Sequence, residues 1–326
     1  MAVTTYLNAI NQALREEMQR DEKVYLLGED IGIYGGAFKV TKGLLEEFGK
    51  ERVIDTPISE SAIIGVAVGT AIAGMRPVAE IQFADFITCG FNQLVTNAAT
   101  LYYRHEIPIP MVVRTPSGGG IHGGAFHSKN PEAWFVKQPG LKVVAPATAR
   151  DAKGLLKSAI RDNNPVIFFE HKFLYRRIKE DLPEDEEILI PLGQAKIART
   201  GGDITIVTYG SMLHASLEAA EKLSREKNIE IEVIDLRTLQ PLDLETIYES
   251  ISKTNRVVLV HEDTLTGGIG AEISALITEK AFEMLDAPIK RVAALDSPTP
   301  YSPILEKQFL PNADKIQKAV LEVIEF

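Results

Sequence analysis

An acidic residue at the start of an apolar helix is the first candidate for chemistry in this 326-residue chain. Glu60 follows Ser59, a residue type that favours helix N-termini, and precedes the almost wholly apolar run Ile63–Ile72. An acid in the first turn is favoured by the helix dipole, which would make Glu60 a structural residue. A carboxyl group in an apolar site has instead a raised pKa and suits proton chemistry. The residues alone leave both interpretations open.

Two histidines near a glycine-rich loop are the second candidate. His122 and His127 stand five positions apart, in and just beyond the loop predicted over Thr115–Gly124. Such a histidine is either simply solvated or available for acid–base chemistry near neutral pH. No cysteine or carboxylate accompanies them, which argues against a zinc site.

Several catalytic motifs are missing from the sequence. It contains no G-x-x-x-x-G-K-[ST], no G-x-G-x-x-G followed by a suitable acid, no G-x-S-x-G and no H-E-x-x-H. The net charge of -10, without a Lys/Arg-rich block, argues against nucleic acid as a partner. The single cysteine, Cys89, excludes an intrachain disulfide, and we expect it to be a buried, inert thiol.

Alternating strands and helices must position these residues. The acidic, proline-containing segment Ile178–Glu187 is predicted to be a linker or surface crossing that closes a first domain, and the alternation restarts at Asp203. This pattern predicts an α/β fold of two domains with parallel sheets, residues 1–187 and 188–326. Ligands of such sheets bind at the carboxyl ends of strands, so we expect the loops after Ile54, Phe83 and Arg114 to lie near one another.

The predicted helices indicate the cellular compartment of the protein as well as its fold. Ile87–Arg104 is predicted to be one long helix, and a proline-marked loop, Pro298–Pro303, to precede the last helix, Asp314–Ile324. Met1–Asp21 is typical of an amphipathic helix and lacks the features of a secretory signal. The glycine-containing Ile63–Ile72 helix has no basic flanks, so we expect no membrane span and a cytoplasmic protein.

Five segments carry a resemblance to a known family. They read TPISESAIIGVAVGTAIAGMRPVAEIQFADF, TPSGGGIHGGAFHS, QPGLKVV, RDNNPVIFFEHKFLYR and VIDLRTLQPLD. In this order the chain resembles beta subunits of the thiamine-diphosphate-dependent decarboxylase component of 2-oxo acid dehydrogenase complexes. The resemblance implies a pyrimidine-binding domain followed by a transketolase C-terminal-like domain. It also implies oxidative decarboxylation of a 2-oxo acid, with transfer of the acyl group to lipoamide of the acyltransferase.

The resemblance assigns roles to individual residues. Glu60 matches the acid that faces N1′ of the cofactor's aminopyrimidine, and His127 matches the loop histidine that helps to pass the acyl group to lipoamide. His122 matches less closely, and Arg114 is expected to begin and orient the histidine loop. Cofactor-binding positions implied beside Glu60 are Ile58, Gln82 and Phe86, the last in place of a tyrosine found in many relatives. A potassium site formed mostly by backbone carbonyls is implied at Met111, Ala159, Ile160, Asp162 and Asn164.

An absent motif implies a partner chain. Enzymes of this chemistry hold the cofactor's diphosphate through Mg²⁺ with a GDG segment, and this sequence has no GDG. The resemblance therefore implies an alpha subunit that holds the Mg²⁺ and shares the cofactor, in a heterotetramer of two alpha and two beta chains. Gly65 and Gly69 in the apolar helix suit close packing against another subunit. The C-terminal domain is expected to dock on the dihydrolipoyl acyltransferase core.

The substrate is less well defined by the motifs. AEIQFADF, FFEHK and LTGGIGAEI resemble branched-chain 2-oxo acid members, whereas pyruvate members share IRDNNPV and VIDLRTLQPLD, and acetoin members share ADF. We therefore expect a branched-chain 2-oxo acid, with pyruvate or acetoin as the alternative. A transketolase-like half-enzyme and a non-catalytic docking subunit are further alternatives, against which the intact Glu60 and His127 argue.

Overall fold

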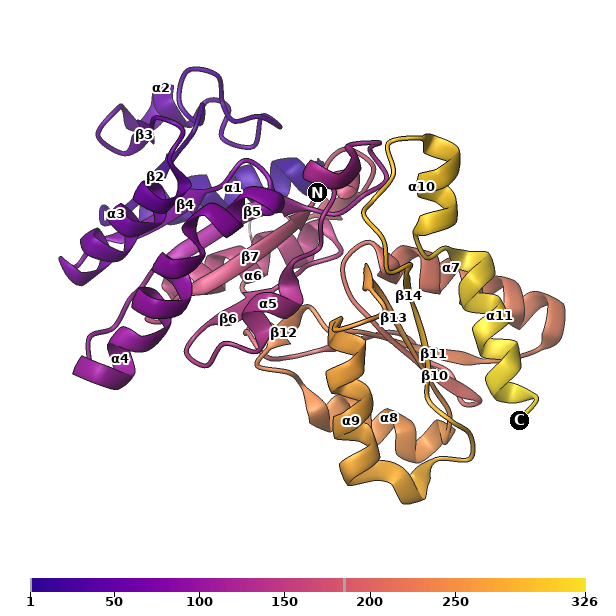
Figure 1. Ribbon diagram of the computed structural model, residues 1–326. Coiled ribbons are helices and arrows are strands. Elements are labelled where there is room, and N and C mark those ends of the chain that lie inside the picture. The colour runs from indigo at the N-terminus through magenta and orange to yellow at the C-terminus, as the bar shows by residue number, and fades with distance from the viewer. Residues whose placement is uncertain (1, 184–185) are drawn as a thin grey trace. The chain divides into compact units, whose positions relative to one another are not determined.

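The computed structural model describes residues 2–183 and 186–326 (Figure 1). The chain divides by its internal contacts into two compact units. The first unit contains the residues up to Ser117 together with Trp134–Leu192, and the second contains Gly118–Ala133 and Gly193–Phe326. This division differs from the limits 1–187 and 188–326 in two places, because 118–133 groups with the second unit and 188–192 with the first.

The first unit contains a parallel sheet whose strands are buried along most of their length. Hydrophobic strands covered on both faces are typical of parallel sheets. Within this unit the strand order is β6-β7-β5-β4-β2-β3. The strands are β2 (Val24–Gly28), β3 (Val53–Asp55), β4 (Arg76–Glu80), β5 (Val112–Ser117), β6 (Lys142–Val144) and β7 (Val166–His171).

Helices cover both faces of this sheet. Val24 and Leu26 belong to a buried core with helices α1 (Tyr6–Arg20) and α6 (Ala149–Arg161). Tyr25, which points the other way, shares a hydrogen bond of 2.7 Å with Thr70 of α3 (Glu60–Ile72). Since alternate strand residues face opposite sides, α3 lies on the face opposite α1 and α6.

The acidic segment predicted to be a linker is partly a strand. Its residues Lys179–Leu182 form β8, which pairs antiparallel with β1 (Ala2–Thr5). Glu184 and Asp185 of that segment lie outside the described residues. A short helix, α2 (Leu44–Phe48), lies between β2 and β3 in the chain.

Helix α3 is not buried all round, as its apolar sequence predicted. Ile63, Ile64 and Ala67 are buried, but Val66 is 52% exposed. A Cβ placed on Gly69 would meet nothing within 4 Å. An apolar helix with an open side within this chain presents a surface suited to another subunit.

The helix predicted over Ile87–Arg104 lies within an uninterrupted run of helical residues, 84–105, whose hydrogen-bond pattern changes along its length. A 3₁₀ helix, η1 (Ala84–Gly90), is followed by a π helix, η2 (Gln93–Ala98), and by α4 (Ala99–His105). Cys89 in η1 is exposed, so the expectation of a buried thiol was wrong.

The second unit contains a five-stranded sheet of order β14-β13-β10-β11-β9, in which only β9 is antiparallel to its neighbour among the described strands. Its strands are β9 (Lys196–Arg199), β10 (Ile204–Thr208), β11 (Ile231–Asp235), β13 (Val257–Thr264) and β14 (Lys290–Ala294). Its longer helices are α7 (Met212–Lys227), α8 (Leu244–Thr254), α9 (Ile269–Ala281), α10 (Pro303–Phe309) and α11 (Ala313–Ile324).

Short elements complete the chain. They are η3 (Gly124–Phe126), α5 (Glu132–Val136), η4 (Lys172–Leu174), β12 (Thr238–Gln240) and η5 (Phe282–Met284). No helix in residues 2–183 and 186–326 has the length and hydrophobicity needed to cross a bilayer.

Candidate active site

Glu60 is the first residue of α3 and is partly exposed. Ser59 holds the N-cap position, as expected, but its side chain makes no capping hydrogen bond. Gly90 of η1 packs against this first turn so tightly that a Cβ there would lie 2.3 Å from Ile64 Cδ1 and 3.1 Å from the Glu60 carbonyl oxygen. A Cβ at position 90 would force Ile64 and the first turn of α3 to shift, so the glycine allows the close packing of α3 against η1.

A second carboxyl group lies near Glu60. Glu29 follows the carboxyl end of β2, and β2 pairs with β3, the strand that leads to Glu60. Glu29 is 6% exposed. Burial raises the pKa of its carboxyl group, and the negative charges of Glu60 and Asp30 raise it further. Sequence reasoning missed Glu29, although its place at the end of a buried strand was a usable signal.

Gln82 lies beside the same two strand ends. Its Nε2 donates long hydrogen bonds to the Glu29 carbonyl oxygen, 3.5 Å, and to Asp30 Oδ2, 3.4 Å. Gln82 follows β4, which pairs with β2 on the side away from β3. The carboxyl ends of β3, β2 and β4 therefore bring Glu60, Glu29 and Gln82 to one edge of the sheet.

Apolar side chains accompany this polar edge. Phe86 of η1 is half-buried and meets Phe83 edge-to-face at 5.9 Å between ring centres. Phe83 in turn packs on Phe38 at 5.4 Å. Ile58, two residues before Glu60, is 83% exposed. An exposed isoleucine and a partly exposed aromatic ring offer apolar surface to a flat ligand.

Arg114 was expected to begin and orient the histidine loop, and that role stays a prediction. It lies within β5, is 1% exposed, and its guanidinium donates to Glu170 at 2.6 and 2.8 Å and to Glu80 at 2.8 Å. Tyr175 donates to Glu170 at 2.7 Å. Burial raises the pKa of Glu80, with Arg114 opposing that shift. Arg114 therefore joins β4, β5 and β7.

His122 and His127 belong to the second unit. His127 is half-buried, and its backbone N–H points to the Gly124 carbonyl oxygen at 3.4 Å. His122 Nδ1 lies 2.6 Å from Glu306 Oε2. The predicted role of His127 beside the cofactor stays a prediction.

The residues predicted to bind potassium already have polar neighbours. Arg76 Nη1 donates to the carbonyl oxygens of Ile160, 2.9 Å, and Asp162, 3.0 Å. The Met111 carbonyl oxygen accepts from Val166 N at 3.0 Å. Each carbonyl oxygen has a second lone pair that these hydrogen bonds leave open, and the potassium site stays a prediction. In the described parts of the chain, no group of three or more His, Cys, Asp or Glu side chains could hold a metal ion.

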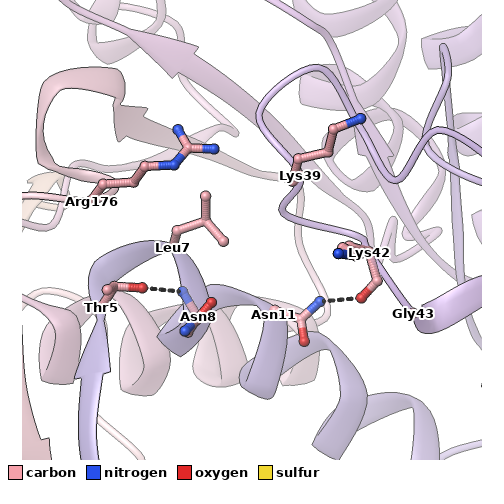
Figure 2. A pocket seen from close by; sticks show the side chains of 8 residues that line it. All are labelled: Thr5, Leu7, Asn8, Asn11, Lys39, Lys42, Gly43 and Arg176. Carbon is pink, nitrogen blue, oxygen red and sulfur yellow. Dashed lines mark hydrogen bonds between the residues drawn. The ribbon is translucent and has the colours of Figure 1, made fainter.

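A separate hollow of about 520 Å³ lies at the start of α1 (Figure 2). It is lined by Thr5, Leu7, Asn8, Asn11, Lys39, Lys42, Gly43 and Arg176. Asn11 donates to the backbone of the loop before α2, and Lys39 and Arg176 donate to the carbonyl oxygens of Tyr34 and Phe38. None of the predicted site residues lines this hollow, whose polar groups mainly brace the loop.

Comparison with known proteins decides the family. Residues 3–177 match the family described as transketolase, pyrimidine binding domain, and residues 193–316 match transketolase, C-terminal domain. The chain is 53% identical over 329 residues to the 2-oxoisovalerate dehydrogenase subunit beta of Bacillus subtilis, with 100% of both chains covered. The chain belongs to the family of 2-oxo acid dehydrogenase beta subunits.

Other relatives agree with this assignment. The pyruvate dehydrogenase E1 component subunit beta of Staphylococcus epidermidis is 45% identical over 328 residues, again over 100% of both chains. A solved split gene transketolase, described as an inactive beta4 tetramer, has a TM-score of 0.81 and 25% identity, and 98% of each chain is covered. Membership of the 2-oxo acid dehydrogenase beta subunits confirms the two-domain α/β fold and the family resemblance found in the sequence.

Proposed function

We propose that this chain is the beta subunit of a branched-chain 2-oxo acid dehydrogenase, the component that decarboxylates the 2-oxo acid and passes its acyl group to lipoamide. The observation that carries the proposal is the edge at which Glu60, Glu29 and Gln82 meet, in a domain that matches the pyrimidine-binding family. The 53% identity to a 2-oxoisovalerate dehydrogenase subunit, against 45% to a pyruvate dehydrogenase subunit, supports the branched-chain substrate.

The residues at this edge fit the aminopyrimidine of thiamine diphosphate. Ile58 and Phe86 offer apolar surface, and Glu60 offers a carboxyl group at the start of a helix. When bound, thiamine diphosphate supplies the carbon nucleophile and takes up the electrons released by decarboxylation. Gln82 lies on the adjacent strand end, where it can donate a hydrogen bond to a ligand.

The two carboxyl groups suit proton transfer. Glu29 keeps its proton at higher pH than an ordinary glutamate, partly because the negative charge of Glu60 lies near. Two carboxyl groups that repel each other as anions favour a state in which one is protonated. We assign to Glu60 the donation of a proton to the ring nitrogen N1′ and its later recovery.

An alpha subunit completes the site in this proposal. The chain has no GDG segment for a Mg²⁺–diphosphate site, so the cofactor's diphosphate and its Mg²⁺ are assigned to the alpha chain. The open side of α3, with Val66 exposed and no atom within 4 Å of a Cβ on Gly69, supports a subunit contact. We place the resulting heterotetramer of two alpha and two beta chains in the cytoplasm.

Three further assignments rest on the family resemblance. His127 passes the acyl group to lipoamide, and the C-terminal domain docks on the acyltransferase core. A potassium ion binds the carbonyl oxygens at Met111, Ala159, Ile160, Asp162 and Asn164. Thermal melting in KCl, compared with choline chloride at equal ionic strength, tests the ion, because a ligand bound only by the folded state raises Tm.

A substrate panel tests the proposal as a whole. The purified chain alone should bind no thiamine diphosphate, and addition of the cognate alpha chain should restore binding and activity. The reconstituted enzyme should have a higher kcat/KM for 3-methyl-2-oxobutanoate than for pyruvate. A higher value for pyruvate would favour the second candidate, a pyruvate dehydrogenase. Ketol transfer without use of lipoamide would favour a transketolase-like half-enzyme, the activity named for the solved relative.

A further inference from the structure

The loop that carries His127 is rich in glycine, so it needs contacts from outside to hold one conformation. Residues 118–124 contain five glycines, each of which loses more conformational freedom on folding than other residues do. Such a segment takes one conformation only if groups outside it hold its backbone. Two buried glutamates of the second unit, Glu262 and Glu306, provide those contacts, and nothing in the sequence motifs pointed to either.

Glu306 binds the first half of the loop. It lies on α10 and is 1% exposed. Its Oε1 accepts the Gly120 N–H at 2.9 Å, and its Oε2 accepts the His122 N–H at 3.2 Å and contacts His122 Nδ1 at 2.6 Å. A hydrogen bond to an ionised carboxylate is stronger than one between neutral groups. The loss of such a bond costs most free energy where the carboxylate is buried.

Glu262 binds the loop on both sides of His127. It lies in β13 near its carboxyl end and is 6% exposed. Its Oε1 accepts the Gly119 N–H at 2.6 Å and the Asn130 side-chain N–H at 3.1 Å. Ser211, which follows β10, donates to its Oε2 at 2.5 Å. One side chain thus ties the residues before and after His127 to the ends of two strands.

The backbone angles and a hydrogen bond at the base of the loop also indicate that outside contacts hold the loop in one conformation. His122 has a φ of 61°, in the left-handed region that non-glycine residues rarely adopt unless the surroundings hold them there. The loop also closes at its base, where the Gly118 N–H donates to the Lys129 carbonyl oxygen at 3.1 Å. His127 therefore lies between fixed points on either side.

We propose that Glu262 and Glu306 are positioning residues that fix the His127 loop for acyl transfer. Neither acts on substrate; both act through the backbone that aims the His127 imidazole. The proposal rests on the role given to His127 under the proposed function. A reacting group displaced by about 1 Å loses up to about 100-fold in rate, so loss of either carboxylate should slow the step that uses His127.

Hydrogen exchange of the full-length chain tests the positioning directly. In Glu306→Gln and Glu262→Gln, the amides of residues 118–130 should exchange at least about tenfold faster than in the wild type, with other segments unchanged. Glu322→Gln removes the same charge from an exposed ion pair with Lys290 and should leave loop exchange unchanged. Unchanged loop exchange in both test variants would overturn the proposal. If a variant does not fold, Asn130→Ala, which removes one bond to Glu262, should show the same change in smaller degree.

Enzyme assays with the alpha chain separate positioning from general damage. Lipoamide-dependent turnover should fall about tenfold or more in both glutamate variants, whereas decarboxylation measured with an artificial electron acceptor should stay within about twofold of wild type. An equal fall in both assays would overturn the positioning role. His127→Ala serves as the reference. If it keeps lipoamide turnover, the role of His127 in the proposed function fails, and faster loop exchange in the glutamate variants would still show that they order the loop.

Discussion

Glu29 and Glu60 follow the carboxyl ends of two paired parallel strands, and the charge of Glu60 contributes to the raised pKa of Glu29. In the proposed function this pair is the chemical centre of the first unit, because it places a buried carboxyl group with a raised pKa near a more exposed one. The two residues call for different tests. Glu60 is expected to act on the cofactor, and Glu29 is expected to set the local charge.

Glu60→Gln should abolish activity without loss of assembly. The amide keeps the size of the side chain but cannot exchange a proton with N1′, and loss of such acid–base catalysis costs about 100-fold or more in kcat. Turnover of the reconstituted enzyme and its elution volume in gel filtration measure the two effects. Dissociated subunits in the variant would mean that Glu60 is structural, as the helix-dipole interpretation of the sequence allowed.

Glu29→Gln should change stability in a pH-dependent way. The folded protein holds the Glu29 proton more tightly than the unfolded chain, so the carboxyl group costs stability as pH rises above its ordinary pKa of 4.5. The Tm of the variant minus that of the wild type should therefore become more positive from about pH 4 to pH 7.

A control with the opposite sign is available for this measurement. The ion pair with Lys290 lowers the pKa of Glu322. Its stabilising effect is present above the ordinary value and lost as pH falls, so Glu322→Gln should make the Tm difference more negative towards pH 7. If the Tm difference changed in the same direction with pH in both variants, the opposite pKa shifts of Glu29 and Glu322 could not be its cause.

Val66→Asp should prevent assembly with the alpha chain while the beta chain still folds. Val66 is 52% exposed on α3, so a charge there is solvated in the free chain but buried without a partner in a subunit contact. Phe282→Asp, at a side chain 68% exposed in the second unit, is the matched control. Sedimentation of each variant with the alpha chain measures assembly, and full assembly of Val66→Asp would remove α3 from the interface.

Gly124→Ala should destabilise the second unit. Gly124 has a φ of +65°, and a Cβ there would lie 2.2 Å from a ring carbon of Tyr301. Strain of this kind costs about 1–3 kcal/mol. Gly202→Ala is the control, because a Cβ at Gly202 meets nothing within 4 Å. Urea unfolding of the two variants gives the comparison, and equal midpoints would show that Tyr301 moves aside freely.

Arg114→Met should be among the most damaging substitutions in the first unit. It leaves Glu80 and Glu170 buried without their cation, and removal of one partner of a buried ion pair costs about 3–5 kcal/mol. Arg104→Met, at an exposed position of α4, should change the free energy of unfolding by less than about 0.5 kcal/mol. A Tm of Arg114→Met equal to that of the control would contradict the importance of the network.

The sequence predicted those features that depend on local pattern. The alternation of apolar segments gave the α/β fold and most element limits within a few residues; α11, for example, begins at Ala313 rather than Asp314. The helix expected at Ile87–Arg104 lies within the helical run 84–105, but apolar periodicity did not reveal its 3₁₀ and π segments or the close approach of Gly90 to Ile64 of α3. Helix α10 was missed because prolines suggested a loop, although Pro303 occupies the first helical turn, where proline is well tolerated.

In the candidate site, too, the sequence predicted local features and missed contacts between distant segments. Glu60 was found from its place before an apolar helix, and family resemblance supplied its proposed role. Glu262 and Glu306 were not found, because the backbone groups that they bind lie more than 140 residues earlier in the chain. A buried glutamate whose partners are distant backbone N–H groups looks, in sequence, like any surface acid. Its meaning appears only once the fold brings the two segments together.

The assignment of residues 118–133 to the second unit constrains how this gene can be divided or recombined. An exchange of halves between two relatives at Leu192 would join a histidine loop from one parent to the Glu262 and Glu306 of the other. The histidine loop and the two glutamates must therefore be inherited as one set, although Trp134–Leu192 of the first unit separates them in the chain. Chimeras that move residues 118–133 together with the C-terminal half respect this boundary, and simple two-part fusions do not.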